Sequence, residues 1–432
     1  MKQFIFILSL CGCCASGVLG DTTNAPQDLT LAEAEAIALK YHPQIAQANY
    51  LTLAAQEAVT ETRAGYYPNV SLVSDAVAAD DQGTRILAGG LNNPTIYDRA
   101  AGGVQASQLI TDFGRTANLA ASSKYQAQAQ SQSANATREQ VLLNVDVSYF
   151  SAAEAQAVLR VAQQTLDTRR TLLDQITALA TNKLRSELDV SFAQVELQQA
   201  RLLVERAQND ADASMASLST SLGYNKFQQF QLTEQMPATN AVTTDVDGLV
   251  QTALSHRPEL LSLRDDREAA LRYAKSQRDS RLPQIDAIGV AGDAPWHNSH
   301  LPDDYAAGGI QLSLPLFAGG YYVAKQREAE LKAQADDELL RNVENNVIRD
   351  VRIAWLNVND AIAQLATTEE LTINATESFT LAQARYQSGL SSIVELSDAQ
   401  LNLTSAQISE ANARYNVLIQ QANLNYQTGL IQ

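Results

Sequence analysis

The sequence contains only three cysteines, Cys11, Cys13 and Cys14, and none of its 432 residues after position 14 is a cysteine. If the N-terminal leader is removed as an export signal, disulfides, thiol catalysis and cysteine-ligated zinc are excluded. Four histidines occur, and none belongs to an H-E-x-x-H zinc helix. A glycine-rich phosphate loop and a G-x-S-x-G elbow are also absent. We therefore predict that the protein is not an enzyme and has no cofactor or metal.

Long apolar runs are also missing. Beyond the leader, no stretch reaches the roughly 18 consecutive apolar residues of a transmembrane helix, so any membrane crossing must use β-strands. Positive charge is scarce, because 31 Lys and Arg face 48 Asp and Glu, for a net charge of −17. Nucleic acid is therefore not a predicted partner. If the chain lines a passage, this balance favours cations.

Two long tracts lack the residues that interrupt helices. Arg115–Leu222 contains neither glycine nor proline, and residues 321–430 contain only Gly389 and Gly429. Ala, Gln, Leu, Glu and Arg are frequent in both, and these residues favour helices. Each tract, 115–222 and 321–430, is predicted to form a pair of long helices.

Residues 1–20 have the pattern of a signal peptide: Lys2, an apolar run and then small residues before Asp21. Cleavage after Gly20 would leave a mature chain without cysteine. A lipoprotein signal is the alternative, and it would leave Cys11 or Cys13 as an acylated first residue.

The rest of the chain is an internal duplication. Pro43 and Pro258, each at the break between two short helices, lie 215 positions apart, whereas Gly114 and Gly320 lie 206 apart. We predict a first repeat at 21–223, a linker at 224–247 and a second repeat at 248–432. Each repeat would contain two short helices, a β-hairpin and a long helical pair.

The hairpins are expected at 69–111 and 284–317. Alternation of apolar and polar residues predicts their strands, which are Val70–Ala79, Ala101–Ile110, Ile285–Gly292 and Ala307–Leu316. Polar loops are predicted at Asp80–Asp98 and Asp293–Tyr305. The strands suit a bilayer crossing, although a soluble hairpin packed on a helix would show the same alternation. In lipid, four strands cannot leave open edges, so three copies supplying twelve strands would close a barrel.

The last helix of each long pair has a narrow seam in which apolar and small residues recur at steps of three and four. The seam residues in the two copies are Val190, Ala193, Leu197, Ala200, Val204, Ala207, Ala211 and Leu218, and Leu396, Ala399, Leu403, Ala406, Ala413, Val417 and Leu424. Wide polar faces surround this seam. The pattern suits a single-walled tube with water on both sides, and an ordinary coiled coil would also produce it.

With these motifs in place, the chain resembles the TolC-type outer-membrane efflux proteins. The resemblance depends on the duplicated layout and on short motifs in the same order, which are Tyr41-His42-Pro43, His256-Arg257-Pro258, Asp112-Phe113-Gly114-Arg115, Pro315-Leu316-Phe317-Ala318-Gly319-Gly320 and Tyr386-Gln387-Ser388-Gly389-Leu390. It implies an α+β membrane protein: a trimeric, twelve-stranded β-barrel, continuous with a long periplasmic α-helical barrel. Residues 224–247 would contribute to a belt around the helices.

The resemblance also implies partners. The helix turns would close the periplasmic end and open when a periplasmic membrane-fusion adaptor and an inner-membrane transporter (of the RND, ABC or MFS type) dock. The protein would be a homotrimer in contact with outer-membrane lipid, and it would be a passive exit duct for efflux or type I secretion. The alternative is a periplasmic coiled-coil scaffold without a channel, which would have no use for alternating strands.

Site residues follow from the same resemblance. Glu395 and Asp398 match acidic positions that ring the periplasmic entrance, although ordinary solvated acids at a helix start are the alternative. Asp189 and Tyr386 match positions that hydrogen-bond between neighbouring coils in the closed state. The turns that would contact the adaptor are Asn182, Lys183, Leu184, Arg185 and Ser186, and Ser388, Gly389, Leu390 and Ser391.

The turns also depart from the family pattern. Ser391 stands where some relatives have a basic residue that helps to hold the second turn. The first turn lacks the usual glycine. Lys183 or Arg185 is the candidate for the missing positive charge.

Overall fold

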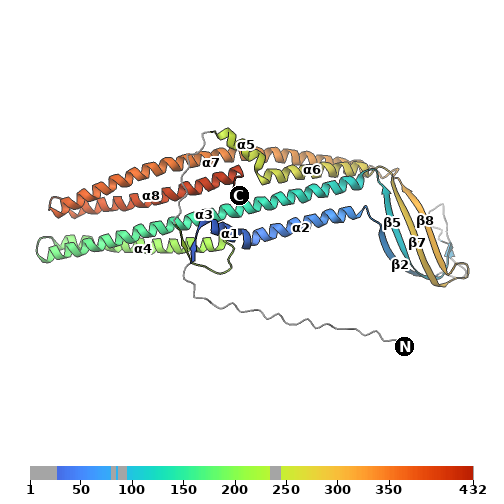
Figure 1. The fold of residues 1–432 in the computed structure, drawn as a ribbon, viewed down its shortest axis with the longest axis horizontal. Helices are drawn as coiled ribbons and strands as arrows, with labels where there is room; N and C mark the ends of the chain where they lie inside the picture. The colour runs from blue at the N-terminus through green and yellow to red at the C-terminus, as the bar shows by residue number, and fades with distance from the viewer. Residues whose placement is uncertain (1–26, 79–83, 86–94, 234–244, 432) are drawn as a thin grey trace, which may run out of the picture.

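The computed structural model describes residues 27–78, 84–85, 95–233 and 245–431. The predicted signal peptide with Cys11 and Cys13, most of the Asp80–Asp98 loop and residues 234–244 of the linker lie outside these ranges. Within them the molecule is elongated, with a bundle of helices that ends in a small sheet (Figure 1).

The two halves have the same order of main elements. The first half contains α1 (Leu31–Tyr41), α2 (Pro43–Ala64), β2 (Asn69–Val77), β5 (Arg99–Thr111), α3 (Arg115–Thr181) and α4 (Glu187–Ser221). The second half contains α5 (Val246–His256), α6 (Pro258–Asp279), β7 (Gln284–His297), β8 (Asp304–Ser313), α7 (Tyr321–Gln387) and α8 (Ile393–Thr428). Short strands β1 (Gln27–Leu29), β3 (Thr84–Arg85), β4 (Thr95–Ile96) and β6 (Phe230–Leu232) complete the described chain.

Local chemistry sets where the helices begin. Thr30 and Glu33 form a capping box at the start of α1. Pro43 occupies the first turn of α2, where its missing N–H costs nothing. At the start of α3, the Asp112 carboxylate accepts hydrogen bonds from the backbone N–H groups of Gly114 and Thr116. Gly114 has φ 108°, a conformation that favours glycine.

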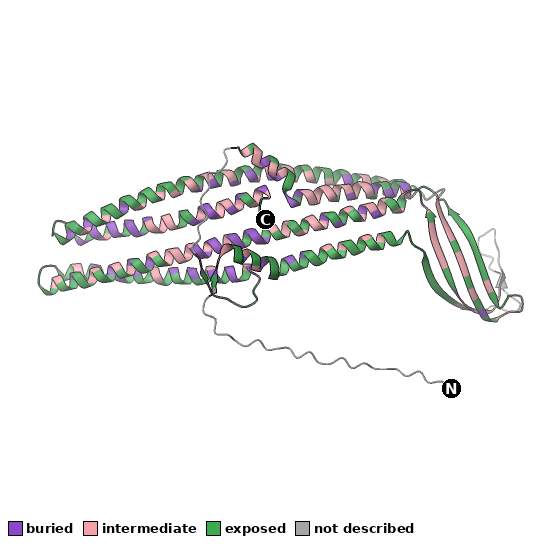
Figure 2. Cartoon of the chain, viewed as in Figure 1, coloured by how far each residue is buried: buried purple, intermediate pink, exposed green. Residues whose placement is uncertain are grey.

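The long helices α3 and α7 each contain 67 residues, so each is about 100 Å long at ~1.5 Å per residue. The predicted seams are buried along α4 and α8, as Leu197, Ala200, Leu403 and Ala406 illustrate. The remaining faces are largely exposed in one chain, as the alternation of purple and green along the helices in Figure 2 shows. One chain therefore forms a thin layer of helices and not a thick core.

Small residues let α3 and α6 approach each other closely. The Ser122 hydroxyl of α3 donates to the carbonyl of Ala269 in α6 at 2.8 Å, and Ser262 of α6 donates to Ala129 of α3 at 2.9 Å. Side-chain hydroxyls can reach a neighbouring helix backbone only when little bulk separates the two. These bonds fix α3 against α6 next to the sheet.

The four main strands form one antiparallel sheet in the order β2-β5-β7-β8. Its register places apolar and small residues of all four strands on one face, namely Val70, Leu72, Val104, Ala106, Ala287, Ala291, Ile310 and Leu312. The opposite face carries many polar residues, including Asn69, Ser71, Gln105, Ser107, Asp286 and Gln311. Strands β2 and β8 lie at the two edges, and neither has a second partner strand among the described residues.

Two boundaries of the second hairpin differ from the prediction. β7 continues to His297, so the predicted loop at Asp293–Tyr305 is much shorter, because Ala294 N–H donates to Asp303 O and extends the pairing. β8 ends at Ser313, so Leu314 and Leu316 lie beyond the strand although they continue its alternation. Pro315 between them has no N–H to donate to a neighbouring strand. Among the described residues, no helix is long and apolar enough to cross a membrane.

Residues from the start of the chain and from the linker meet on the helices. β1 pairs in parallel with β6, so Leu29 lies beside Leu232. The Tyr149 hydroxyl of α3 donates to the Leu29 carbonyl at 3.0 Å and also lies 3.1 Å from the Thr233 carbonyl. Leu29, Tyr149 and Phe230 share a buried cluster with residues of α1, α4 and α8. The β1–β6 pair and this buried cluster lie about midway along the long helices (Figure 1).

The buried carboxylate of Asp146, on α3, should make the stability of the protein depend on pH. Burial and the neighbouring Glu35 raise the pKa of Asp146 to about 8, and Asp146 Oδ1 has no hydrogen-bond partner within the described structure. The folded state therefore favours the protonated acid, and stability should fall as pH rises from about 4, the unfolded pKa, to about 8. Asp146→Asn should lose less stability between pH 5 and pH 9 than the wild type. Thermal unfolding followed by circular dichroism checks this, and parallel losses in both proteins would contradict it.

Helix packing leaves two free edges in one chain. α3 packs against α1, α2, α4, α6 and α8, whereas α7 packs against α5, α6 and α8. The layer order is therefore α2-α3-α6-α7 near the sheet and α4-α3-α8-α7 near the turns (Figure 1). Strand β2, α2 and α4 form one edge, and β8 and α7 form the other.

Candidate functional site at the helix turns

The two turns that connect the long helices lie together at the end of the molecule farthest from the sheet (Figure 1). Both have the same backbone pattern. Leu184 N–H donates to Leu179 O at 2.9 Å, and Leu390 N–H donates to Arg385 O at 2.8 Å. These six-residue loops are Schellman motifs, and each is followed by a serine that caps the next helix, Ser186 before α4 and Ser392 before α8.

The two turns differ at the position of this motif that adopts the left-handed backbone conformation, where the first turn lacks a glycine. Gly389 occupies it in the second turn with φ 73°, and Lys183 occupies it in the first turn with φ 59°. A residue with a Cβ is strained there by about 1 kcal/mol or more. The first turn therefore keeps the same conformation at a cost in stability.

Lys183→Gly should relieve this strain and stabilise the protein by about 1 kcal/mol, less the entropy that glycine adds to the unfolded chain. The melting temperature of the helical circular dichroism signal should rise slightly. Gly389→Lys is the matched variant and should lower it. If Lys183→Gly instead destabilises the protein, the lysine side chain makes a contact that stabilises the turn by more than the left-handed strain costs.

Arg185 of the first turn contacts Tyr386 at the end of α7. Its guanidinium lies over the tyrosine ring at 4.3 Å from the centroid, and Nη2 donates a short hydrogen bond to the Tyr386 carbonyl. Tyr386 is 4% exposed, and its hydroxyl has no hydrogen-bond partner among the described residues. Burial raises the pKa of Tyr386, and Arg185 opposes the shift. Of the two candidate basic residues, Arg185 therefore joins the two turns.

The acidic site residues have different local roles. The Asp189 carboxylate accepts from the Ser186 N–H at 3.4 Å and completes a capping box, so within one chain it stabilises the start of α4. Glu395, at the equivalent position of α8, turns away from its cap, and its Oε1 lies 3.0 Å from Arg385 Nε. Asp398 is exposed and makes no ion pair in the described structure.

The other turn residues present a mixed surface. Leu184 and Leu390 are exposed, so each turn offers an apolar side chain at its tip. Asn182 and Ser388 instead bind back to their own helices, at Ala178 O and Ala384 O respectively. Ser391 has no charge to offer, and its buried Oγ makes no hydrogen bond to any described residue.

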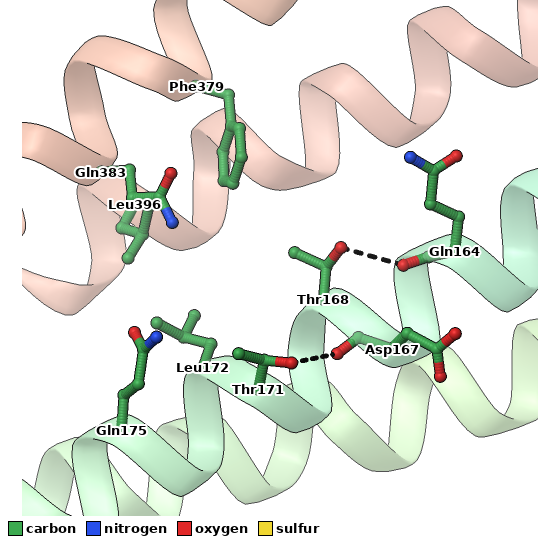
Figure 3. A pocket seen from close by; sticks show the side chains of 9 residues that line it. All are labelled: Gln164, Asp167, Thr168, Thr171, Leu172, Gln175, Phe379, Gln383 and Leu396. Atoms are coloured by element: carbon green, nitrogen blue, oxygen red, sulfur yellow. Dashed lines mark hydrogen bonds between the residues drawn. The ribbon is translucent and has the colours of Figure 1, made fainter.

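A groove of about 290 Å³ runs beside the turns between α3 and the second helical pair. Figure 3 shows Leu172 on α3 pointing toward Leu396, with Phe379 above them. Polar residues of α3, Gln164, Asp167, Thr168, Thr171 and Gln175, form the other side. The Thr168 and Thr171 hydroxyls donate to carbonyls one turn earlier, so the groove presents methyl groups together with glutamine amides.

Sequence reasoning missed three features of this end. Arg385 precedes Glu395 by only ten residues across the turn, so the pair could have been proposed from the hairpin itself. No sequence pattern indicated the groove, or the contact of the buried Arg169 of α3 with Ser397 of α8, because both depend on α8 lying beside α3. The described residues contain no cluster of three potential metal-ligating side chains.

Comparison with known proteins gives a consistent result. The family model described as "Outer membrane efflux protein" matches residues 36–224 and 249–430. Outer membrane protein TolC of Escherichia coli is 25% identical over 391 residues, which cover 88% of this chain and 78% of TolC. The solved VceC outer membrane protein of Vibrio cholerae has a TM-score of 0.76 at 17% identity, covering 92% of this chain and 96% of VceC. The MtrE channel of Neisseria gonorrhoeae has a TM-score of 0.74 at 19% identity, covering 93% and 89%.

Proposed function

Because the chain belongs to the outer membrane efflux protein family, we propose that it is the outer-membrane exit duct of a tripartite efflux or type I secretion system. The duct is passive. A periplasmic adaptor and an inner-membrane transporter of the RND, ABC or MFS type open its periplasmic end and supply the energy. No catalytic group is needed for this role.

The sheet is the observation that carries the proposal. All four strands place apolar and small residues on one face and many polar residues on the other, as lipid outside and water inside require. No described strand pairs with the outer sides of the edge strands β2 and β8, and such open edges cannot remain in lipid. Pairing β2 of one copy with β8 of the next satisfies both edges.

The helices support the same assembly. Each chain has one edge made by α2 and α4 and an opposite edge made by α7. A head-to-tail contact between unlike edges forms a closed ring when the rotation between copies is right. Three copies would give a homotrimer with twelve strands and a continuous helical barrel, and β1, β6 and the linker would belong to a belt around it.

The turns are the proposed periplasmic entrance. Glu395 and Asp398 would surround its axis in three copies, and Asp189 with Tyr386 would contribute to the closed state. The exposed tips at Leu184 and Leu390 and the groove beside Leu172 would receive the adaptor.

A periplasmic scaffold without a channel is the competing function. It would need the coiled coils but not a four-stranded sheet with one apolar and exposed face. The sheet therefore favours the duct.

The test is extraction of the full chain from outer membranes in detergent, followed by determination of its oligomeric state and planar-bilayer recording. We expect a trimer that produces discrete conductance steps. A folded trimer that never conducts would exclude the duct and leave the scaffold.

A further inference from the structure

The loop between β7 and β8 lies at the end of the sheet farthest from the helices (Figure 1). His297 is the last residue of β7, and residues 298–303 lead from it to β8. The imidazole of His297 has an acceptor at each ring nitrogen. Nδ1 lies 2.9 Å from the Asn298 carbonyl oxygen, and Nε2 lies 2.7 Å from Asp303 Oδ1. The ring therefore bridges the first and last residues of the loop.

Both acceptors of His297 are satisfied only if its ring is a doubly protonated imidazolium. A neutral imidazole has one N–H and can donate to only one of the two oxygens. The Asn298 carbonyl has no proton to give. The Asp303 side chain is 89% exposed, and a solvated carboxyl group is an anion at neutral pH. The observed contacts therefore belong to the charged form of His297.

The surroundings of His297 favour this charge. Its pKa lies above the ordinary histidine value, because the Asn298 carbonyl and then the Asp303 carboxylate accept from the ring, and Asp293 on the same strand adds to the effect. Crossing a bilayer takes about 9–11 residues of a strand. Because His297 is the last of the 14 residues of β7, it lies beyond the crossing, in contact with water.

The neighbouring strands carry charges of both signs. Arg99 of β5 is the register partner of His297, so both side chains lie on the same face of the sheet. A second cation opposes protonation of His297, but the Arg99 guanidinium forms an ion pair with Asp75 of β2 at 2.7 Å. From β8, Asp304 lies opposite Asp293. The charge of Arg99 is thus offset, and the acids on β7, on β8 and in the loop favour the imidazolium.

The same loop is joined to the first hairpin. Asn298 N–H donates to the Asp98 carbonyl at 2.9 Å, and the His300 ring stacks on Tyr97 with centroids 5.2 Å apart. His300 Nδ1 lies 2.7 Å from Asn298 Oδ1. Within the described structure this is the one acceptor at the His300 ring, and a neutral imidazole satisfies it. His300 therefore needs no second proton, whereas His297 does.

We propose that residues 298–303 form a pH-sensitive clasp at the outer mouth of the duct. At acidic pH, protonated His297 holds both the Asn298 carbonyl and the Asp303 carboxylate, and the loop stays fixed to β7 and to the first hairpin. At alkaline pH the ring loses one proton and can donate to only one of them, so Asp303 is released into water. The position at the mouth rests on the proposed function, whereas the clasp rests on the contacts of His297.

The sign of the pH dependence follows from the raised pKa of His297. The clasp is fully formed below about pH 6.5, the ordinary histidine value, and is lost as the pH rises through the higher value of the clasped ring. Arg99 and His297 share the polar face of the sheet, which lines the passage in the proposed barrel. Cargo would therefore leave past a loop whose order follows the pH outside the cell.

A nitroxide label on the loop tests the proposal in the purified full chain in detergent. Ser299→Cys places the label at an exposed position, once Cys11, Cys13 and Cys14 are replaced by serine. Electron paramagnetic resonance between pH 5 and pH 9 measures the ratio of mobile to fixed label, and the ring resonances of the histidines give the titration of His297. The ratio should rise with pH, about tenfold for each unit that separates the His297 pKa in the clasped loop from that in the released loop.

Three variants identify the group that titrates. His297→Gln has no proton to lose in this range, so the mobility of its label should not change with pH. Asp303→Asn removes the anion and should move the midpoint of the transition to lower pH. His300→Gln is the matched control, because it removes the neighbouring imidazole and should keep the transition of the unmodified loop.

Two results would overturn the clasp: a label that is equally mobile at pH 5 and pH 9, or a transition that persists in His297→Gln. Loss of the transition in His300→Gln alone would overturn it as well, because His300 would then be the sensor. These measurements need only folded protein. A trimer that never conducts in planar bilayers would overturn the duct and leave the clasp, and a conducting trimer whose loop ignores pH would overturn the clasp and leave the duct.

Discussion

Arg185→Ala should raise the conductance of the purified channel at least tenfold. Arg185 makes the contact that joins the first turn to Tyr386 of the second pair. A hydrogen bond from a charged group contributes about 1.5–3 kcal/mol, and every 1.4 kcal/mol changes an equilibrium tenfold. Its loss in each copy should let the two pairs of a chain separate and add an opening that the wild type keeps closed. Single-channel recording in planar bilayers measures this.

Tyr386→Phe is the informative control for this experiment. It keeps the ring under Arg185 and removes only a hydroxyl that has no partner within the described chain. Conductance should remain at the wild-type level if the ring and the carbonyl carry the contact. Lys183→Gly removes a neighbouring positive charge and should also have no effect. If Tyr386→Phe opens the channel and Arg185→Ala does not, the hydroxyl makes a hydrogen bond between neighbouring coils in the closed state, as the family resemblance implies.

Neutralising the acidic residues of the second turn should have the other large effect. Glu395→Gln together with Asp398→Asn should weaken block by a trivalent cation at least tenfold and reduce cation preference. At about 6 Å in water each pair of unit charges contributes about 0.7 kcal/mol, so a trivalent ion loses about 2 kcal/mol per carboxylate before screening. Reversal potentials and block curves at low salt provide the measurement.

The single variants should differ. Arg385 lies 3.0 Å from Glu395 and offsets part of its charge, whereas Asp398 is exposed without an ion pair in the described structure. Asp398→Asn should therefore weaken block more than Glu395→Gln, and Arg385→Ala should strengthen it. Unchanged selectivity in the double variant would show that these acids do not surround the passage.

Local patterns in the sequence were sufficient to predict most of the elements. Because Arg115–Leu222 contains neither glycine nor proline, helix was its predicted conformation, and α3 and α4 occupy it. Alternation located the strands for a similar reason, because side chains in a strand point alternately to two faces. It failed at Leu314 and Leu316, where alternation continues but Pro315 cannot pair.

The candidate site was predictable only in part. The acids Asp189 and Glu395 at the starts of α4 and α8 were identified from the family resemblance, and the turn around Gly389 has a recognisable sequence. The left-handed Lys183 had no local signal, because only comparison with Gly389 in the folded turn reveals it. The same holds for the contacts of Arg169 with Ser397 and of Arg185 with Tyr386, because these partners lie 228 and 201 positions away in the sequence.

By itself, the sequence determined which residues form long helices and strands, where the chain repeats and that the surface is acidic. These properties depend on interactions over a few residues, or on composition, and they are therefore readable in order along the chain. The tertiary structure alone decided that α8 lies beside α3, that Arg185 contacts Tyr386, and that β2, α4 and α7 remain at free edges. Those contacts join residues up to 239 positions apart, as between Thr165 and Thr404, and no local pattern specifies such a pairing.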